Sequence, residues 1–277
     1  MTCDLCNGTK YSELFKVSGK RDYDSPYKKD NIYTIVKCNN CGLVYTKDDL
    51  SLEEINDIYS EGYFTGRDER GYKKYIERHE NSFKNKFFRF IFRSSNHPGL
   101  HIKLVNKYAK NKGNLLEIGC AAGFFLEVAK KKGWNVTGIE ISEFVSSYAR
   151  EKLGLNVFTG KIEDLLKNGT IKKEQFDVVT LWATLEHIAV PSRLFESINY
   201  VLKLNGYLFF TTINIEGKEA KEQGESWFSI RPPKHLYYFT ESTIKRYLDK
   251  YGFEIVQDAD YTNQKMIIAA KKLRNFK

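Results

Sequence analysis

Residues 115–123 read LLEIGCAAG, and this stretch decides which fold the rest of the chain is expected to adopt. An apolar run, which predicts a strand, passes through small residues directly into a helical pattern. Small residues after a strand let the backbone turn tightly and approach a ligand closely. The spacing from Gly119 to Gly123 is G-x-x-x-G, whereas a pyrophosphate site needs G-x-G-x-x-G. The loop therefore predicts a ligand-binding turn and weakens the prediction of a dinucleotide cofactor.

Two acidic residues stand beside this loop. Glu117 would repel a pyrophosphate, but it would attract a ligand with an ammonium group, such as the methionine end of S-adenosylmethionine. Glu140 follows 23 residues later, at the end of the next predicted strand, where an acid can bind both ribose hydroxyls. The alternative is an ordinary tight turn with an acid at the surface. The loop, the two acids and the strand–helix order together favour S-adenosylmethionine.

From residue 113 onward, apolar strands alternate with amphipathic helices, which is typical of a parallel α/β sheet. Strands are expected over 114–118, 135–140, 155–159, 176–182, 206–213, about 253–260 and 264–271. Helices are expected over 123–132, 142–153, 191–202 and 240–251. Ser142 is expected to cap the second of these helices, and a proline stands in the first turn of the third.

Five stretches resemble motifs of the class I, Rossmann-like S-adenosylmethionine-dependent methyltransferases. Residues 115–123 resemble the first motif of that family, and residues 138–142 resemble the second. Residues 176–187, FDVVTLWATLEH, are similar to the fourth-strand motif of the subgroup that includes the quinone-biosynthesis O-methyltransferases. Residues 204–212, LNGYLFFTT, resemble the fifth-strand motif, and residues 232–240, PPKHLYYFT, resemble a late motif of bacterial small-molecule methyltransferases.

This resemblance covers roughly residues 55–270 and implies a fold and a set of cofactor contacts. The implied fold is a seven-stranded, mostly parallel sheet flanked by helices, with its last strand antiparallel. Cys120 is expected to be a small packing residue rather than a nucleophile. Aromatic residues before the fold, at positions 59, 63 and 64, would form a lid, although ordinary helix packing is an equal alternative. The resemblance also implies which residues contact the cofactor, either at its methionine end, ribose, adenine and sulfonium or as a lid over it. They are Glu117, Gly119, Cys120, Ala121, Gly123, Glu140, Ile141, Ile162, Glu163, Trp182, Ala183, Tyr59, Tyr63 and Phe64.

Two histidines follow the predicted fourth and fifth strands, His187 in LEH and His235 in PPKH. The carboxyl ends of parallel strands form the ligand crevice of such sheets. Methyl transfer is an in-line displacement in which an enzyme mainly positions the reactants, and a base near an acceptor hydroxyl assists. Imidazole, with an ordinary pKa of about 6.5, suits that role. Each histidine is a candidate catalytic base; the alternatives are that one only binds a loop, or that Tyr237 or Tyr238 acts instead.

Four cysteines form two CxxC pairs, Cys3 with Cys6 and Cys38 with Cys41, separated by 31 residues. Two such pairs supply four thiolates for tetrahedral zinc and leave no open position for catalysis. The cysteines therefore predict structural zinc in a small zinc-ribbon-like module, the alternative being four thiols without metal. Some sugar C-methyltransferases are similar to this chain in carrying an N-terminal zinc module.

The patterns divide the chain into three parts. We expect a zinc-ribbon-like module over residues 1–47, a helical linker or lid over 48–112, and the methyltransferase domain over 113–277. Within the second part, residues 71–93 mix phenylalanines with lysines and arginines. Packing of these aromatics on the domain is favoured over a helix on a membrane surface.

Bulk composition limits the function classes. The formal net charge of +9 favours anionic partners, such as nucleotide-linked substrates, nucleic acid or anionic lipid, or else reflects a lysine-rich solvated surface. No apolar run of about 18 residues predicts a membrane span, and the N-terminus has no apolar signal region. Paired cysteines fit a reducing compartment, so a cytoplasmic location is expected.

The function expected from these features is transfer of a methyl group from S-adenosylmethionine to a small molecule, a sugar or related hydroxyl being favoured. One alternative is carbon methylation of a nucleotide-linked sugar. A less favoured one is RNA binding through the ribbon and the basic surface, since no N/D-P-P-Y motif follows the fourth predicted strand.

Overall fold

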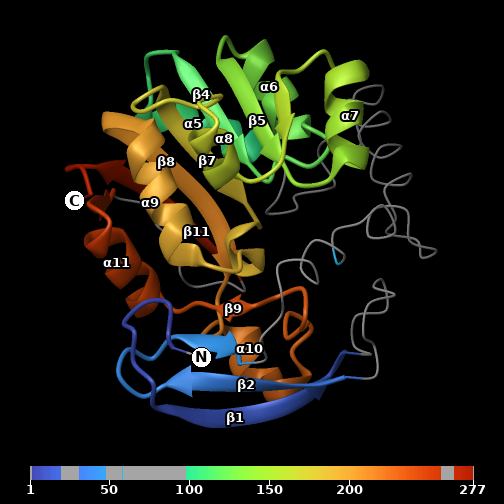
Figure 1. The fold of residues 1–277 in the computed structure, drawn as a ribbon, viewed down its shortest axis with the longest axis vertical. Helices are drawn as coiled ribbons and strands as arrows, with labels where there is room; N and C mark the ends of the chain where they lie inside the picture. Colours follow the sequence, from blue (N-terminus) through green and yellow to red (C-terminus); the bar gives the residue numbers. More distant parts are fainter. Residues whose placement is uncertain (1, 20–30, 48–57, 59–97, 257–264, 277) are drawn as a thin grey trace.

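The computed structural model of this 277-residue chain describes residues 2–19, 31–47, 58, 98–256 and 265–276. A large sheet carries helices on both faces, and a small antiparallel sheet lies below it in the view of Figure 1. In the described part of the chain, no helix combines the length and the apolar character that crossing a membrane requires.

The large sheet has seven strands in the order β10-β11-β8-β7-β4-β5-β6. Their bounds are β4 (Asn114–Ile118), β5 (Asn135–Glu140), β6 (Val157–Thr159), β7 (Phe176–Trp182), β8 (Leu202–Ile213), β10 (Phe253–Ile255) and β11 (Lys265–Lys272). Pairing is parallel from β6 to β8, and β11 runs antiparallel to both β8 and β10. The predicted seven-stranded, mostly parallel sheet with an antiparallel last strand is confirmed.

Helices cover the two faces of this sheet in separate groups. One core contains residues of α5 (Pro98–Tyr108), α6 (Phe124–Lys131) and α7 (Glu143–Glu151). The other contains residues of α8 (Ile162–Lys167), α9 (Pro191–Val201) and α11 (Glu241–Lys250). Leu115 and Leu116 of β4 belong to different cores, because successive side chains of a strand point to opposite faces.

Short helical segments lie near the carboxyl ends of two central strands. The 3-10 turn η2 (Leu185–His187) follows β7, whereas α10 (Lys218–Gln223) and η3 (Gly224–Ser226) follow β8. Connections after parallel strands form the ligand crevice of an open α/β sheet. These segments therefore stand where a site is expected.

The small sheet combines three strands from the N-terminal part of the chain with one from the region after β8. Its strands are β1 (Tyr11–Ser18), β2 (Ile32–Cys38), β3 (Val44–Thr46) and β9 (Tyr237–Tyr238), in that order. β9 comes from the late motif of the methyltransferase region and pairs antiparallel with β3. The N-terminal module is therefore completed by a strand from the region that follows β8.

Polar contacts also attach this module to the helices of the large sheet. Asp4, between the first two cysteines, accepts hydrogen bonds from the backbone N–H and the hydroxyl of Ser192 at 2.9 and 2.7 Å. The Tyr247 hydroxyl donates to the same carboxylate at 2.7 Å. Ser192 lies in the first turn of α9, where unpaired N–H groups favour a carboxylate. The first CxxC pair is thus tied to both α9 and α11.

Several local expectations differ from the structure. β8 begins at Leu202, four residues before the strand expected from 206, because its start pairs with Phe176 of β7. Ser142 takes the N-cap position of α7 but makes no side-chain capping bond. Thr240 does cap α11, through a reciprocal pair of bonds with Thr243.

Other expectations fall outside the described residues. These include the lid residues Tyr59, Tyr63 and Phe64, the basic aromatic stretch 71–93 and most of the segment 48–112. The proposed domain boundaries at 47/48 and 112/113 stay predictions.

Candidate functional site

The glycine loop after β4 adopts a conformation that side chains disfavour. Gly119 and Gly123 have φ of +71° and +80°, in the left-handed region. A Cβ at Gly119 would lie 2.6 Å from Thr184, and one at Gly123 would lie 2.7 Å from Leu155. Both glycines are therefore required by backbone conformation and by space, as the sequence pattern predicted.

Glu140 holds this loop from the end of β5. Its buried carboxylate accepts hydrogen bonds from the backbone N–H of Ala121 at 2.8 Å and of Ser142 at 3.0 Å. Ala121 has φ of +45°, uncommon for a residue with a side chain. Burial raises the pKa of Glu140, and the two N–H donors act against that rise. The acid thus fixes the loop and is itself fixed in orientation.

Glu117 lies under the loop as a buried acid with an unsatisfied atom. Its side chain is 4% exposed, and its Oε2 has no hydrogen-bond partner among the described residues. Burial raises the pKa of Glu117 well above its ordinary value, and the neighbouring Glu140 raises it further. Leaving a buried carboxylate without a partner costs free energy, and a positively charged ligand would supply that partner. The position of Glu117 therefore fits such a ligand.

The loop's cysteine is buried, whereas Trp182 at the end of β7 and Ala183 after it are half-buried. Cys120 is buried, and burial raises the pKa of its thiol well above the ordinary value, so no thiolate nucleophile is available there. Trp182 stacks on His101 of α5 with ring centroids 3.7 Å apart. Ala183 has φ of +53°, and its N–H donates to the Thr211 hydroxyl at 2.9 Å.

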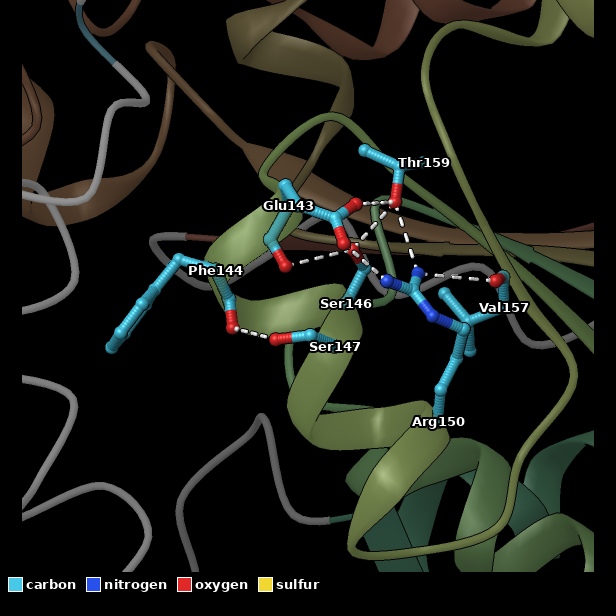
Figure 2. A network of polar contacts seen from close by, with 7 residues as sticks. All are labelled: Glu143, Phe144, Ser146, Ser147, Arg150, Val157 and Thr159. Atoms are coloured by element: carbon cyan, nitrogen blue, oxygen red, sulfur yellow. Dashed lines mark hydrogen bonds and ion pairs between the residues drawn. The ribbon is translucent and has the colours of Figure 1, made fainter.

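A polar network joins α7 to β6 (Figure 2). The Thr159 hydroxyl donates to Glu143 at 2.5 Å and lies 2.7 Å from the Ser146 hydroxyl. Arg150 donates to Thr159 at 3.0 Å and pairs with Glu143. The Thr159 hydroxyl bond lowers the pKa of Glu143, with Arg150 acting in the same direction. This network fixes the edge where the adenine contacts are expected.

The three residues predicted for adenine are close in sequence to residues of this network. Ile162 is buried in the core at the start of α8, whereas Ile141 and Glu163 are half-buried. The loop follows β4, the two acids lie near the carboxyl ends of β4 and β5, and these residues follow β5 or β6, so all belong to one edge of the sheet.

His187 and His235 meet at the ends of β7 and β8. Their rings are 4.7 Å apart between centroids and nearly perpendicular, at 76°. His187 Nδ1 donates to the Lys234 carbonyl at 3.0 Å, and His235 Nδ1 donates to the Ser229 carbonyl at 2.7 Å. With the proton on Nδ1, each Nε2 is left with a lone pair. The two residues that the sequence proposed as bases are therefore brought together.

Burial keeps this pair uncharged. It lowers the pKa of His187, and it lowers the pKa of His235 well below the ordinary value, with the neighbouring His187 acting in the same direction. Glu186 is buried beside them and accepts a hydrogen bond from the Thr212 hydroxyl at 2.8 Å. Ligand atoms of Glu186, His187 and His235 all lie within 4.8 Å of one another. The cluster offers two neutral bases and one acid at the crevice.

The two tyrosines considered as alternatives are engaged elsewhere. The Tyr237 hydroxyl donates to the Ala189 carbonyl at 3.1 Å, and the Tyr238 hydroxyl donates to the His235 carbonyl at 3.0 Å. Burial raises the pKa of both phenols. Neither is suited to accept a proton near neutral pH.

The four paired cysteines converge in the N-terminal module. Cys3 and Cys41 have sulfurs 3.4 Å apart, Cys6 and Cys38 have sulfurs 3.6 Å apart, and all four lie within 4.8 Å of one another. Zinc–sulfur bonds of about 2.3 Å in a tetrahedron place sulfurs roughly 3.8 Å apart. The donor set therefore fits one zinc ion.

Sequence reasoning missed several residues that shape the site. Glu186 stands next to His187 in the LEH motif, which is a signal that could have identified it. Thr211 and Thr212 lie near the end of β8, and hydroxyls there after a buried run could also have been noted. His101, which supports Trp182, carries no signal in the sequence around it.

Comparison with known proteins gives a consistent result. A family model described as a methyltransferase domain matches residues 93–258. Over 119 residues, the chain is 37% identical to the ubiquinone biosynthesis O-methyltransferase of Actinobacillus pleuropneumoniae, a match that covers 39% of this chain and 51% of that protein. The chain thus spans about half the length of the curated relatives it matches.

Two solved structures share the fold. A SAM-dependent methyltransferase from Thermotoga maritima has a TM-score of 0.51 at 21% identity, over 71% of this chain and 98% of that one. Another from Archaeoglobus fulgidus has a TM-score of 0.51 at 21% identity, over 68% of this chain and 100% of that one.

The lowered pKa values of the two imidazoles predict how stability depends on pH. As the pH falls, the two histidines of the unfolded chain bind protons near their ordinary pKa of about 6.5. In the folded protein they bind protons only at a lower pH. The contribution of these histidines to the free energy of unfolding is therefore constant above that pH. Below it, the free energy of unfolding decreases by up to about 1.4 kcal/mol per histidine and pH unit. Urea unfolding between pH 5 and 8 measures this loss. In a His187→Gln/His235→Gln variant the slope below pH 6.5 should be shallower; an unchanged slope would contradict the assignment.

Proposed function

The chain belongs to the methyltransferase domain family, and from this premise we propose that it transfers a methyl group from S-adenosylmethionine to a small molecule. The single observation that carries the proposal is Glu117, whose buried Oε2 is without a partner beside a glycine loop. An α-amino group would supply the missing charge and the missing hydrogen bonds.

The residues around the loop fit the rest of such a cofactor. Glu140, already oriented by Ala121 and Ser142, retains acceptor capacity for ribose hydroxyls. Gly119 and Gly123 let the loop backbone turn tightly against Thr184 and Leu155. When bound, the cofactor supplies an activated methyl group on a sulfonium centre.

Further contacts would follow from the positions predicted earlier. Ile141, Ile162 and Glu163 would border the adenine, near the network of Figure 2. Trp182 and Ala183 would border the sulfonium, with Cys120 packing behind the loop. Tyr59, Tyr63 and Phe64 stay lid predictions.

On the acceptor side, we infer that His187 or His235 takes the proton of the acceptor group. Each has Nδ1 occupied by a backbone carbonyl, so Nε2 can accept. Their lowered pKa values keep that nitrogen unprotonated at neutral pH. The chain's own contribution is then to orient both reactants and to hold a neutral base near the acceptor.

For the acceptor itself we propose a hydroxyl group. The matched curated relatives are named as O-methyltransferases, which favours oxygen over carbon and gives no support to a sugar in particular. A sugar or related hydroxyl stays the prediction from the sequence, and carbon methylation of a nucleotide-linked sugar stays the alternative. Product analysis by mass spectrometry and NMR separates the two.

For the four-cysteine cluster we propose structural zinc, held by Cys3, Cys6, Cys38 and Cys41. Four thiolates complete a tetrahedron, so this ion would stabilise the module and take no part in the transfer. A reducing compartment such as the cytoplasm suits such a site.

Removal of the Glu117 charge tests the cofactor site. In Glu117→Gln, affinity for S-adenosylhomocysteine should fall about 10- to 100-fold, because one charged hydrogen-bonding partner of the ammonium group is lost. The variant without ligand should be about as stable as wild type, because burial and Glu140 raise the pKa of Glu117 and favour its uncharged form, which the amide resembles. Isothermal titration calorimetry and thermal unfolding measure the two effects.

The matched control is Glu254→Gln, on an exposed position of β10. It should leave affinity unchanged. Equal affinity of Glu117→Gln and wild type would contradict the role of Glu117, and absence of any binding by wild type would contradict the proposed function.

Replacement of each histidine tests the base. His187→Ala or His235→Ala, whichever removes the true base, should lower kcat about 10²- to 10⁴-fold. S-adenosylhomocysteine affinity should stay within about twofold, since the imidazoles lie beyond the loop that holds it. The assay is release of S-adenosylhomocysteine with hydroxyl acceptors such as catechols and sugars. Near-normal rates in both variants would indicate that positioning alone suffices.

Metal analysis tests the cysteine cluster. Purified chain should carry about one equivalent of zinc, and Cys38→Ser should lose it together with thermal stability. Cys120→Ser provides the matched control, because that cysteine lies in the other core and outside the cluster. Less than half an equivalent of zinc in wild type would contradict the assignment.

A further inference from the structure

We propose that the N-terminal module, through Thr46 of β3, positions the segment 234–236 and thereby both histidines of the acceptor side. The inference rests on the proposed function, because it assigns the module a role in the same site. It makes Thr46 a positioning residue, since its hydrogen bonds reach the site through the backbone of the segment.

Thr46 holds the segment with two hydrogen bonds. Its backbone N–H donates to the Leu236 carbonyl at 2.9 Å, and its hydroxyl donates to the His235 carbonyl at 3.1 Å. The Tyr238 hydroxyl donates to the same His235 carbonyl at 3.0 Å. The backbone of His235 is thus held from the module side by β3 and from its own side by β9.

The opposite side of the segment holds η2. The Lys234 carbonyl accepts the proton of His187 Nδ1 at 3.0 Å, and the Leu236 N–H donates to the Glu186 carbonyl at 2.8 Å. Three consecutive residues therefore contact β3 on one side and η2 on the other. A displacement of β3 would move both imidazoles.

β9 depends on the module for its pairing. Among the described strands it pairs with β3 alone, through Val44 with Tyr238 and Tyr45 with Tyr237. Directly after β9, Phe239 forms a bridge with Asn214 that does not involve the module. Without β3, His235 would keep its bonds to Ser229, Arg231 and Tyr238 and its ring contact with His187, but it would lose the bond from the module.

The cysteine cluster sets the position of β3. Thr46 follows Cys41 by five residues, and the Cys38 N–H donates to the Leu43 carbonyl at 2.9 Å across the tight turn between them. The module is fixed independently of β9, because Asp4 binds α9 and the Arg246 side chain donates to the Cys41 carbonyl at 3.2 Å. A metal held by the cluster therefore fixes where Thr46 meets the segment.

The test compares Thr46→Val with Thr9→Val in the full chain. Valine keeps the shape of threonine but removes the donor to His235, whereas Thr9 is exposed in the loop before β1. The readout is NMR titration of the two imidazoles, assigned with the single histidine variants. A second arm removes zinc with 1,10-phenanthroline and then restores it.

In Thr46→Val and in the chelated protein, the NMR titration midpoint of His235 should rise by about half a pH unit or more, toward 6.5. The reason is that an imidazole held less firmly is better hydrated. The charged groups facing the pair, Glu186, Arg231 and Lys234, remain in every variant. Zinc content of Thr46→Val and its affinity for S-adenosylhomocysteine should match wild type. Restored zinc should restore the wild-type midpoint.

The inference would be overturned if His235 had the same titration midpoint in wild type, in Thr46→Val and in the chelated protein. An equal shift in Thr9→Val would also overturn it, by showing a general loosening of the module. Failure of wild type to bind S-adenosylhomocysteine would instead refute the proposed function, and the imidazole titrations would still report whether the module positions the segment.

Discussion

The parallel pairing of β4 with β5 on one side and with β7 on the other is the constraint on which the rest of the structure depends. Parallel strands end at the same edge, so the connections after all three strands meet there. The glycine loop, the acid that holds it and η2 are those connections. Residues up to about 70 positions apart in the sequence thereby share one crevice.

The crevice concentrates buried polar groups that the fold does not fully satisfy. Glu117 has an oxygen without a hydrogen-bond partner among the described residues, and Glu140 accepts hydrogen bonds from Ala121 of the loop and from Ser142. Most buried polar atoms in a protein are paired, so such groups indicate a ligand. Their arrangement places the expected positive ligand charge beneath the loop and neutral bases farther along the edge.

The N-terminal module contributes to this edge rather than standing apart from it. The buried residues around its cysteines, such as Leu5 and Leu43, belong to the same core cluster as α9 and α11, and its sheet is completed by β9. A small module has little core of its own, so docking and metal binding would both stabilise it. The same contacts that stabilise the module also hold the segment beside the histidines.

The sequence by itself determined the strands of the sheet, the glycine loop, Glu117, Glu140 and the four cysteines, because each depends on a local pattern or a fixed spacing. Tertiary structure alone decided that His187 and His235 are in contact, that Trp182 packs on His101, and that β9 joins β3. These contacts link residues 48 to about 190 positions apart. The physical reason is that local pattern reports backbone preference and burial, whereas contacts between distant segments follow from how strands pair and helices pack.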